Sequence, residues 1–422
     1  MQAQGSGRSQ TIRPRTHDWG TSMKKQVLVL GGNFGGLTAA ITLKKALHGD
    51  VDVTVMSDRD YFLYNPSLIW LPFGLRKRED ITFQVGPTFE AAGVEFVQKA
   101  AAKIEPELNR VVDVDGVIHP YDYLVIATGT VNDWARVPGV KENAGTIVTL
   151  ADAEDSGRRW REFLNDPGDI VIGATQGASC FGAAYEYLFN VSYQLRKAGI
   201  KKQVKLTYVT AEPYLGHFGI DGMPTGEFMV DMFMKKESIT AITNMAMEYV
   251  SKDAVKLADG RELPFKYAMV VPPFLGVDAV RSCDTISNAA GFVPVRDTYQ
   301  TKTYDNVYAV GLAAAVQVPW TTPVAVGVPK TGFPTEIQAH VAAANIASQI
   351  AGLVPTREKP FAEIPALCVM DAGNNGIMLL GDHMLKPRRA AMLIPGPQNH
   401  AIKIGLEKYF LWKSRTGRVN LP

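Results

Sequence analysis

The chain has 422 residues, too many for one compact core, because a domain typically holds about 150 residues. Hydrophobic residues make up 46% and charged residues 20%, which excludes disorder, a collagen-like structure or a coiled coil as the main architecture. The 44 Lys and Arg against 42 Asp and Glu leave a net charge of +2, which argues against a nucleic-acid-binding protein. Three cysteines, Cys180, Cys283 and Cys368, are too few for a disulfide scaffold.

The first residues of the chain show no targeting signal. Residues 1–22 are polar and contain no apolar block of the kind found in a signal peptide. We expect a disordered extension, or a start upstream of the true one at Met23. The longest apolar stretch, residues 307–328, is interrupted by Pro319 and Pro323, so no transmembrane helix is predicted.

A first β-α-β unit follows. The apolar run 27–30 is typical of a strand buried on both faces, and a helical pattern over 37–47 and a strand over 51–56 come after it. The turn between the first strand and the helix consists of Gly31, Gly32, Asn33, Phe34, Gly35 and Gly36. Such a turn lets backbone N–H groups approach a dinucleotide pyrophosphate. Asn33 replaces the middle glycine: it tolerates a positive φ, but its side chain is expected to crowd the phosphate. A plain strand-helix turn is the alternative.

Two later strands end in residues typical of the same kind of site. One ends in Thr128 and Gly129, and the other ends in Gly311. The three segments, in this order and on either side of an inserted domain, resemble those of flavoproteins with two dinucleotide-binding domains.

A second β-α-β unit lies between these strand ends. The pattern predicts a strand over 169–172, a turn over 173–182, a helix to about residue 197 and a strand over 204–209, with Glu212 after it. The turn is longer than the glycine motif of NAD(P)H enzymes. It also carries Cys180 and Phe181 where a nicotinamide dinucleotide would lie. The sequence therefore argues against NAD(P)H as the electron donor.

The segments 177–182 and 184–187 closely resemble a motif of sulfide:quinone oxidoreductases, and further agreement extends the resemblance over residues 25–413. The resemblance implies an α/β fold with two Rossmann-like dinucleotide-binding domains and a C-terminal membrane-facing segment. The expected division is an extension (1–22), an FAD-binding domain in two parts (23–135 and 291–360), the second Rossmann-like domain (136–290) and a quinone- and membrane-facing segment (361–422).

The function implied by the resemblance is sulfide oxidation. Members of this family oxidise sulfide to sulfane sulfur or polysulfide and pass two electrons through FAD to quinone. The partners expected from the resemblance are sulfide, a membrane quinone and the membrane surface, which makes the protein a peripheral membrane protein.

The redox cysteines are the largest departure from the family pattern. Cys180 and Cys368 match two of the family's three redox cysteines, but Val148 stands at the third position and Asp152 at a nearby His position. A sulfur bridge between Cys180 and Cys368 would then carry the reaction. Because Cys180 precedes a helix, the helix dipole is expected to lower its thiol pKa. Without the resemblance both cysteines read as small buried hydrophobic residues. Cys283 matches no family cysteine.

Other site residues follow from the resemblance. Glu186 is a candidate base and His217 a candidate proton carrier, while Lys330 would stabilise the negative charge of reduced flavin. Solvated surface side chains are the alternative for all three. Further FAD contacts are expected at Ser57, Asp58, Pro66, Ala101 and Leu312. Since some relatives attach FAD covalently through the cysteine missing here, non-covalent FAD is predicted. No metal site is predicted.

A C-terminal helix carries the membrane prediction. Ile402, Leu406, Tyr409 and Phe410 fall on one helical face, and the basic residues around it are Lys403, Lys408, Lys413, Arg415 and Arg418. This pattern favours a helix on the membrane surface beside a quinone pocket, with Tyr409 and Phe410 stacking on the quinone. An amphipathic helix packed on the core is the alternative.

Two other functions stay open. The two-cysteine pattern also suits the flavin subunit of a sulfide dehydrogenase that passes electrons to a cytochrome. A flavin-binding sulfur sensor without turnover is the third hypothesis. A homo-oligomer is compatible with each of the three.

Overall fold

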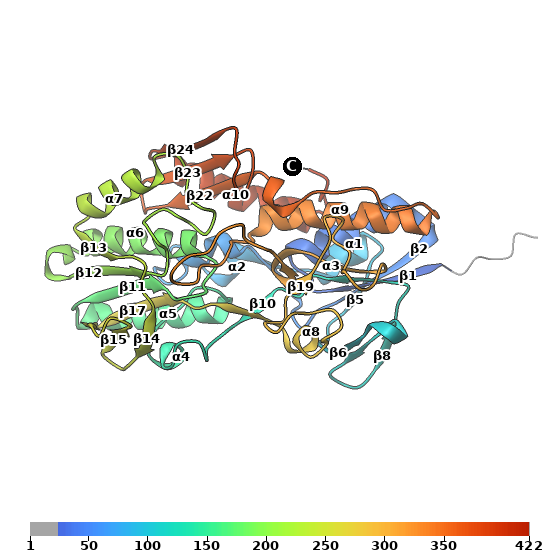
Figure 1. The fold of residues 1–422 in the computed structure, drawn as a ribbon, viewed down its shortest axis with the longest axis horizontal. Coiled ribbons are helices and arrows are strands. Elements are labelled where there is room, and N and C mark those ends of the chain that lie inside the picture. The colour runs from blue at the N-terminus through green and yellow to red at the C-terminus, as the bar shows by residue number, and fades with distance from the viewer. Residues whose placement is uncertain (1–23, 422) are drawn as a thin grey trace, which may run out of the picture.

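Two parallel sheets lie side by side in the computed structural model, which describes residues 24–421 (Figure 1). The extension predicted for residues 1–22 lies outside the described residues. The first sheet has the strand order β20-β9-β1-β2-β5. Its strands are β1 (Lys25–Leu30), β2 (Val51–Met56), β5 (Glu95–Val97), β9 (Tyr123–Ile126) and β20 (Val307–Ala309). Successive β1 side chains from Val27 to Leu30 are all buried, which is why the strand reads as a continuous apolar run.

The first sheet is assembled from two distant parts of the chain. β20 pairs in parallel with β9, so that Val307 lies opposite Leu124. The helices α1 (Phe34–Leu47) and α9 (Gly332–Ile350) pack against each other beside this sheet (Figure 1). Small side chains such as Ala39 and Ala342 have no exposed surface. Such small residues let the two helices approach closely.

The second sheet has the strand order β13-β12-β11-β17, and its strands are also parallel. The strands are β11 (Ile170–Ala174), β12 (Leu206–Thr210), β13 (Ile239–Ile242) and β17 (Tyr267–Val271); the helices around them are α5 (Leu150–Asn165), α6 (Phe181–Lys197) and α7 (Gly226–Lys236). All five residues of β11, β12 and β17 are buried. The predicted α/β fold with two Rossmann-like units is confirmed.

The C-terminal part forms a three-stranded antiparallel sheet followed by a helix. Its elements are β22 (Ala366–Asp371), β23 (Gly376–Gly381), β24 (Ala391–Pro395) and α10 (Gln398–Arg415). β22 contacts both α6 and α10, and in Figure 1 this sheet lies beside α6 and α7. β22 therefore links α6 of the second Rossmann-like unit to α10.

Smaller elements complete the described chain. They are α2 (Arg78–Ile81), α3 (Gly86–Ala91), α4 (Val140–Asn143), α8 (Asp278–Arg281), β3 (Tyr61–Leu63), β4 (Thr82–Gln84), β6 (Ala101–Glu105), β7 (Arg110–Asp113), β8 (Ile118–Pro120), β10 (Thr130–Asn132), β14 (Met247–Val250), β15 (Ala254–Leu257), β16 (Glu262–Pro264), β18 (Phe274–Gly276), β19 (Val293–Pro294) and β21 (Ala314–Ala315).

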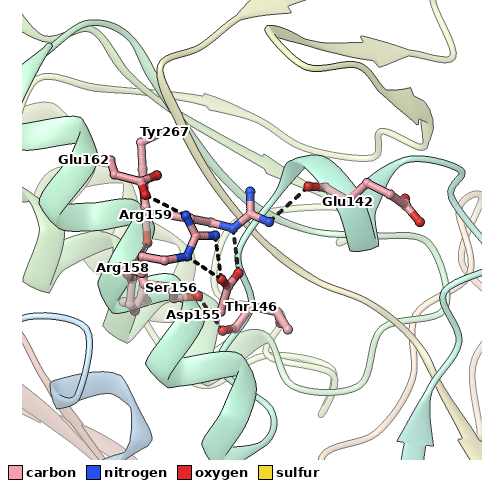
Figure 2. A network of polar contacts seen from close by, with 9 residues as sticks. Glu142, Thr146, Asp155, Ser156, Arg158, Arg159, Glu162 and Tyr267 are labelled. Atoms are coloured by element: carbon pink, nitrogen blue, oxygen red, sulfur yellow. Dashed lines mark hydrogen bonds and ion pairs between the residues drawn. The ribbon is translucent and has the colours of Figure 1, made fainter.

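A polar network holds α5 and the segment before it in place (Figure 2). Asp155 accepts from Arg159 at 2.7 Å, and the Ser156 hydroxyl donates to the backbone carbonyl of Thr146 at 2.6 Å. The Arg159 guanidinium also donates to the Glu142 carbonyl at 3.0 Å. These bonds fix the loop in which Val148 stands.

Helix α10 does not have the orientation predicted for a membrane helix. Lys403 and Lys413, predicted to lie on its basic surround, are buried and paired with Glu186 and Glu336. Phe410 is only 9% exposed and packs in the core of the first unit. The predicted solvent-facing position of Lys403 and Lys413 was wrong, because each lysine pairs with a carboxylate on a helix distant in the sequence. Within residues 24–421, no helix has the length and apolar character needed to span a membrane.

A third buried ion pair fixes the middle of α10. The Glu407 side chain has no exposed surface, and it accepts from Arg76 Nε at 2.8 Å and from the Ser67 hydroxyl at 2.7 Å. Removing one partner of a buried pair leaves an uncompensated charge in a low-dielectric environment.

Replacing Arg76 should therefore loosen α10. We expect Arg76→Met to lower the free energy of local opening by up to about 3 kcal/mol, because the buried Glu407 would keep only the Ser67 hydroxyl and the exposed Lys408 ammonium as partners. Native-state hydrogen exchange of the α10 amides measures this value. The matched control is Arg78→Met, whose pair with Glu154 is nearly half exposed and should contribute less than about 1 kcal/mol. Equal effects of the two substitutions would contradict a role of burial.

Candidate functional site

The glycine-rich turn lies at the carboxyl end of β1 and requires its glycines. Gly31 has a φ of +103°, and a Cβ on it would lie 2.3 Å from the Ala127 carbonyl oxygen. A Cβ on Gly36 would lie 1.8 Å from the carbonyl oxygen of Gly31. The helix α1 begins at Phe34, inside the turn. Backbone N–H groups therefore stand free of side chains at a helix N-terminus, as a pyrophosphate needs.

Asn33 differs from its prediction. Its φ is −95°, so its tolerance of positive φ is not used. Its amide nitrogen donates to Asn65 Oδ1 at 3.1 Å, and its oxygen accepts from the Leu63 N–H at 3.2 Å. Because both polar atoms of the side chain are bound to the 63–65 segment, the side chain is drawn to that segment.

The other predicted FAD residues gather mainly around the same sheet edge. Ser57 and Asp58 follow β2; Ser57 is buried and Asp58 exposed. Gly129 and Gly311 follow β9 and β20 and both have positive φ. The Thr128 hydroxyl is buried and has no hydrogen-bond partner in the described part of the chain. Pro66 lies in a 3-10 turn over Asn65–Trp70, and Ala101 begins β6. The glycine cradle and the unsatisfied hydroxyl fit a bound dinucleotide.

Lys330 is a partly enclosed cation without an acidic partner among its described contacts. Its ammonium donates to the carbonyl oxygens of Leu312 at 2.9 Å and Ala314 at 2.6 Å. It also lies 4.5 Å from the centre of the Phe292 ring. Burial lowers the pKa of Lys330 to about 7. A negative charge on a bound ring system would stabilise this cation, so the residue fits its predicted role better than that of a surface lysine.

The two predicted redox cysteines come from facing elements. Cys180 is the N-cap residue of α6, and Cys368 lies in β22, which packs on α6. Both are free thiols and partly buried. Burial raises the pKa of the Cys368 thiol to about 12, and nearby Glu186 and Cys180 add to this rise. The structure thus brings the two thiols into one electrostatic neighbourhood.

The pKa prediction for Cys180 was wrong. Burial raises the pKa of its thiol, and the opposing hydrogen bond from the Ala183 N–H at the start of α6 does not outweigh it. The helix N-terminus acts in the predicted direction, but desolvation of a thiolate is the larger effect.

Glu186 is buried beside the thiols and is not the solvated helical residue of the alternative interpretation. Its carboxylate forms an ion pair with Lys403 of α10 and accepts from the Asp371 N–H at 2.7 Å. Burial raises the pKa of Glu186 to about 7, while Lys403 opposes that rise. A carboxyl group with this pKa exchanges protons readily near neutral pH.

Three residues extend this site and were missed from the sequence. Asp371 accepts from the Trp70 indole at 2.9 Å and is hydrogen-bonded to His400 Nδ1 at 2.6 Å. The His400 side chain is 34% exposed, whereas the Asp371 side chain is fully buried. Lys403 and the Asp371 N–H therefore hold Glu186 in place, and His400 in turn contacts the Asp371 carboxylate. Lys403 and His400 lie in the C-terminal helical pattern, whereas Asp371 follows Cys368 by three residues on β22.

The remaining predicted residues lie apart from this group. His217 is buried, not a surface residue; its Nδ1 accepts from the Gly219 N–H at 3.2 Å, and burial lowers its pKa. Cys283 is buried in the core cluster that contains Tyr121 and Ile286. The structure therefore separates Cys283 from the cluster that holds Cys180 and Cys368. Asp152 caps α5, accepting from the Thr149 N–H and from Asn132, both at 3.1 Å.

The turn of the second unit is covered by the chain itself. The Gly177 N–H donates to the Ala325 carbonyl at 2.7 Å, and the Gly327 N–H donates to the Ala178 carbonyl at 2.8 Å. Glu212, after β12, is fully buried and accepts from Tyr185, Thr210 and the Phe218 N–H. In nucleotide-binding units, an acid at this place binds the ribose and the turn receives the phosphates. Here both are already engaged within the protein.

The fold and this site define the class of the protein. Residues 25–333 match the pyridine nucleotide-disulphide oxidoreductase family, and the chain belongs to it. Over 403 residues the chain is 36% identical to the sulfide-quinone reductase of Aquifex aeolicus, with 94% of this chain and 93% of the relative covered.

More similarities point the same way. The solved structure of the Aquifex aeolicus sulfide:quinone oxidoreductase superposes with a TM-score of 0.89 over 93% of this chain and 92% of that one. The mitochondrial sulfide:quinone oxidoreductase of Dictyostelium discoideum is 30% identical over 301 residues, covering 68% of this chain and 64% of the relative. Within its class the chain belongs to the sulfide:quinone reductases, which are FAD-dependent oxidoreductases, and the resemblance predicted from the sequence is confirmed.

The covered turn generates a prediction about the electron donor. Anaerobic addition of excess NADH should leave the absorbance of the protein-bound flavin unchanged, because residues 325–327 occupy the turn and Glu212 is buried. Stopped-flow absorbance of the holoenzyme measures this, with dithionite as the control that the flavin is reducible. Rapid bleaching by NADH would contradict this interpretation and support the function of a type II NADH dehydrogenase.

Proposed function

We propose that this protein oxidises sulfide at Cys180 and Cys368 and delivers the electrons to a membrane quinone. The observation that carries the proposal is the packing of β22 on α6: Cys368 lies in β22, Cys180 caps α6, and the buried Glu186 of α6 accepts from the Asp371 N–H of β22. When bound, FAD supplies the two-electron transfer between sulfur and quinone. Hydrosulfide, quinone and one proton then yield sulfane sulfur and quinol.

The steps on the protein concern sulfur and protons. In the oxidised enzyme a bridge joins Cys180 and Cys368, and hydrosulfide attacks one of its sulfurs. A new sulfur–sulfur bond forms, the bridge breaks, and the other sulfur leaves as a thiolate. Glu186 accepts the proton that sulfide loses, and Lys403 keeps the ionised form of this carboxyl accessible. The Asp371 N–H donates to Glu186 and holds its carboxylate in place for this step.

The quinone is assigned to the side of α10. The Phe410 ring lies 6.1 Å from Phe34, in the glycine-rich turn, and 5.9 Å from Tyr64. Tyr409 lies next to it with an edge-on ring contact of 5.6 Å. An aromatic group this close to the cofactor turn supports the role of Tyr409 and Phe410 at the quinone. In this proposal the partly exposed Tyr409 contacts the quinone, and the buried Phe410 packs behind it.

The central test separates the cysteines. Anaerobic mixing with sulfide should bleach the flavin of the wild-type holoenzyme, and decylubiquinone should restore its absorbance. Cys368→Ala should lose bleaching by sulfide while dithionite still reduces the flavin, because the sulfur bridge can no longer form. Cys283→Ala is the matched control and should behave as wild type, since Cys283 lies in another core cluster.

Other outcomes identify the alternatives. Wild-type flavin that sulfide never bleaches would contradict both enzymatic hypotheses and leave a sulfur-binding sensor. Bleaching by sulfide followed by reoxidation by a cytochrome, but not by quinone, would support a flavin subunit of a sulfide dehydrogenase.

The Glu186–Lys403 pair predicts a shift in pH dependence. Hydrogen sulfide itself ionises near neutral pH, so the bleaching rate is divided by the concentration of hydrosulfide at each pH. This corrected rate should still rise through a limb near pH 7, because Glu186 must be ionised to accept a proton and its pKa is about 7. Lys403 lowers that pKa, so Lys403→Met should move the limb to higher pH, and Glu186→Gln should abolish the limb in the corrected rate. The control is Lys408→Met, whose side chain is exposed on the same helix; an equal shift in this control would contradict the assignment.

A further inference from the structure

A cavity of about 670 Å³ opens beside Glu186, and the end of β22, the strand that carries Cys368, forms part of its wall. It lies between α6, α7 and the turn that joins β22 to β23. Its walls are largely apolar and aromatic, with Phe189 and Phe233 in edge-on contact at 6.3 Å and Val230 and Ile377 beside them. This volume is far larger than hydrosulfide requires, and it suits a longer molecule with an apolar body.

The rim of the cavity is basic. Arg196, Lys201, Lys202 and Lys236 line it, and the acid among them, Glu237, is already bound by Arg196 and the Ser192 hydroxyl. Burial and the charge of Arg196 lower the pKa of Lys201 to about 8. A bound anion would offset both effects, so the rim favours a negatively charged ligand.

The floor of the cavity adjoins the redox site. Glu186 and Met370 line the cavity, and the same Glu186 acts electrostatically on both thiols. Met370 lies two residues after Cys368 on β22, and side chains two apart on a strand share one face. Met370 and Cys368 both pack on the core cluster of α6. The flexible Met370 thioether and the carboxyls of Glu186 and Asp371 therefore line the part of the cavity nearest the sulfur site.

We propose that this cavity is the passage and binding site for anionic sulfur species. Hydrosulfide is drawn in by the basic rim. A linear polysulfide lies with its sulfur chain along the aromatic walls and its terminal charge at Lys201 and Lys202. The inference rests on the proposed function, because it takes the anion from the sulfide reaction, but it concerns a site that the reaction itself does not require.

The first test reverses the charge of the rim. In the holoenzyme, Lys201→Glu combined with Lys202→Glu should lower the second-order rate constant for flavin bleaching by sodium sulfide about tenfold at low ionic strength. The matched control combines Lys252→Glu with Lys302→Glu, two exposed lysines on other loops, and changes the net charge equally. High salt should bring the two double variants together. Reoxidation of the reduced flavin by decylubiquinone should be the same in both.

The second test measures binding without turnover. In holoenzyme carrying Cys180→Ala and Cys368→Ala, calorimetric titration with sodium tetrasulfide should give saturable binding. The Lys201→Glu and Lys202→Glu changes should weaken that binding about tenfold, which is 1.4 kcal/mol, and the control pair should leave it unchanged.

The two proposals fail differently. Wild-type flavin that sulfide does not bleach overturns the proposed function, whatever the rim variants do. Normal bleaching in the wild type, with rim variants equal to the control pair in both rate and tetrasulfide affinity, overturns the passage and leaves the proposed function standing.

Discussion

The ion pair between Glu186 and Lys403 is the constraint on which the site depends. It joins α6, which Cys180 caps, to α10, the last helix of the described chain. β22, which carries Cys368, packs against both helices. Burying two charges is costly, and the cost is offset only where further hydrogen bonds satisfy them. Here the Asp371 N–H supplies one such bond to Glu186. The pair therefore requires β22, α6 and α10 to be correctly placed together, and that placement also brings the thiols near the carboxyl.

Burial also decides the charge state of the sulfur site. Since burial raises the pKa of both thiols, the reduced site holds two neutral thiols, and an isolated thiolate is disfavoured there. Attack on a sulfur bridge avoids this difficulty, because the incoming hydrosulfide brings its own charge. In the proposed mechanism Glu186 accepts the proton that sulfide loses, since its raised pKa of about 7 lets it exchange protons near neutral pH.

The sequence correctly predicted those features of the site that depend on residues close together in the chain. The glycine turn, the strand ends at Thr128 and Gly311, and Cys180 with Glu186 on one helix all depend on residues close together in the chain, and the structure has them at the expected elements. Lys403 was misplaced for the opposite reason. A helical pattern places polar residues toward solvent by default, and its buried partner lies 217 positions away. The predicted direction of the Cys180 pKa shift was wrong for a similar reason. A helix dipole can be inferred from the sequence, whereas burial by a distant strand cannot.

The start of α5 explains the surroundings of Val148, which stands where the family has its third redox cysteine. Asp152, at the family's His position, caps this helix together with Thr149, and Ser156 binds the Thr146 carbonyl. The segment around Val148 is thereby bonded into the second unit, and its polar groups serve the helix rather than the sulfur site. A catalytic cysteine needs a side chain that is free to approach a partner, whereas a capping segment needs one fixed backbone. The surroundings of Val148 are thus consistent with the proposed two-thiol site, in which Cys180, Cys368 and the Glu186 carboxyl carry the sulfur chemistry without a third cysteine.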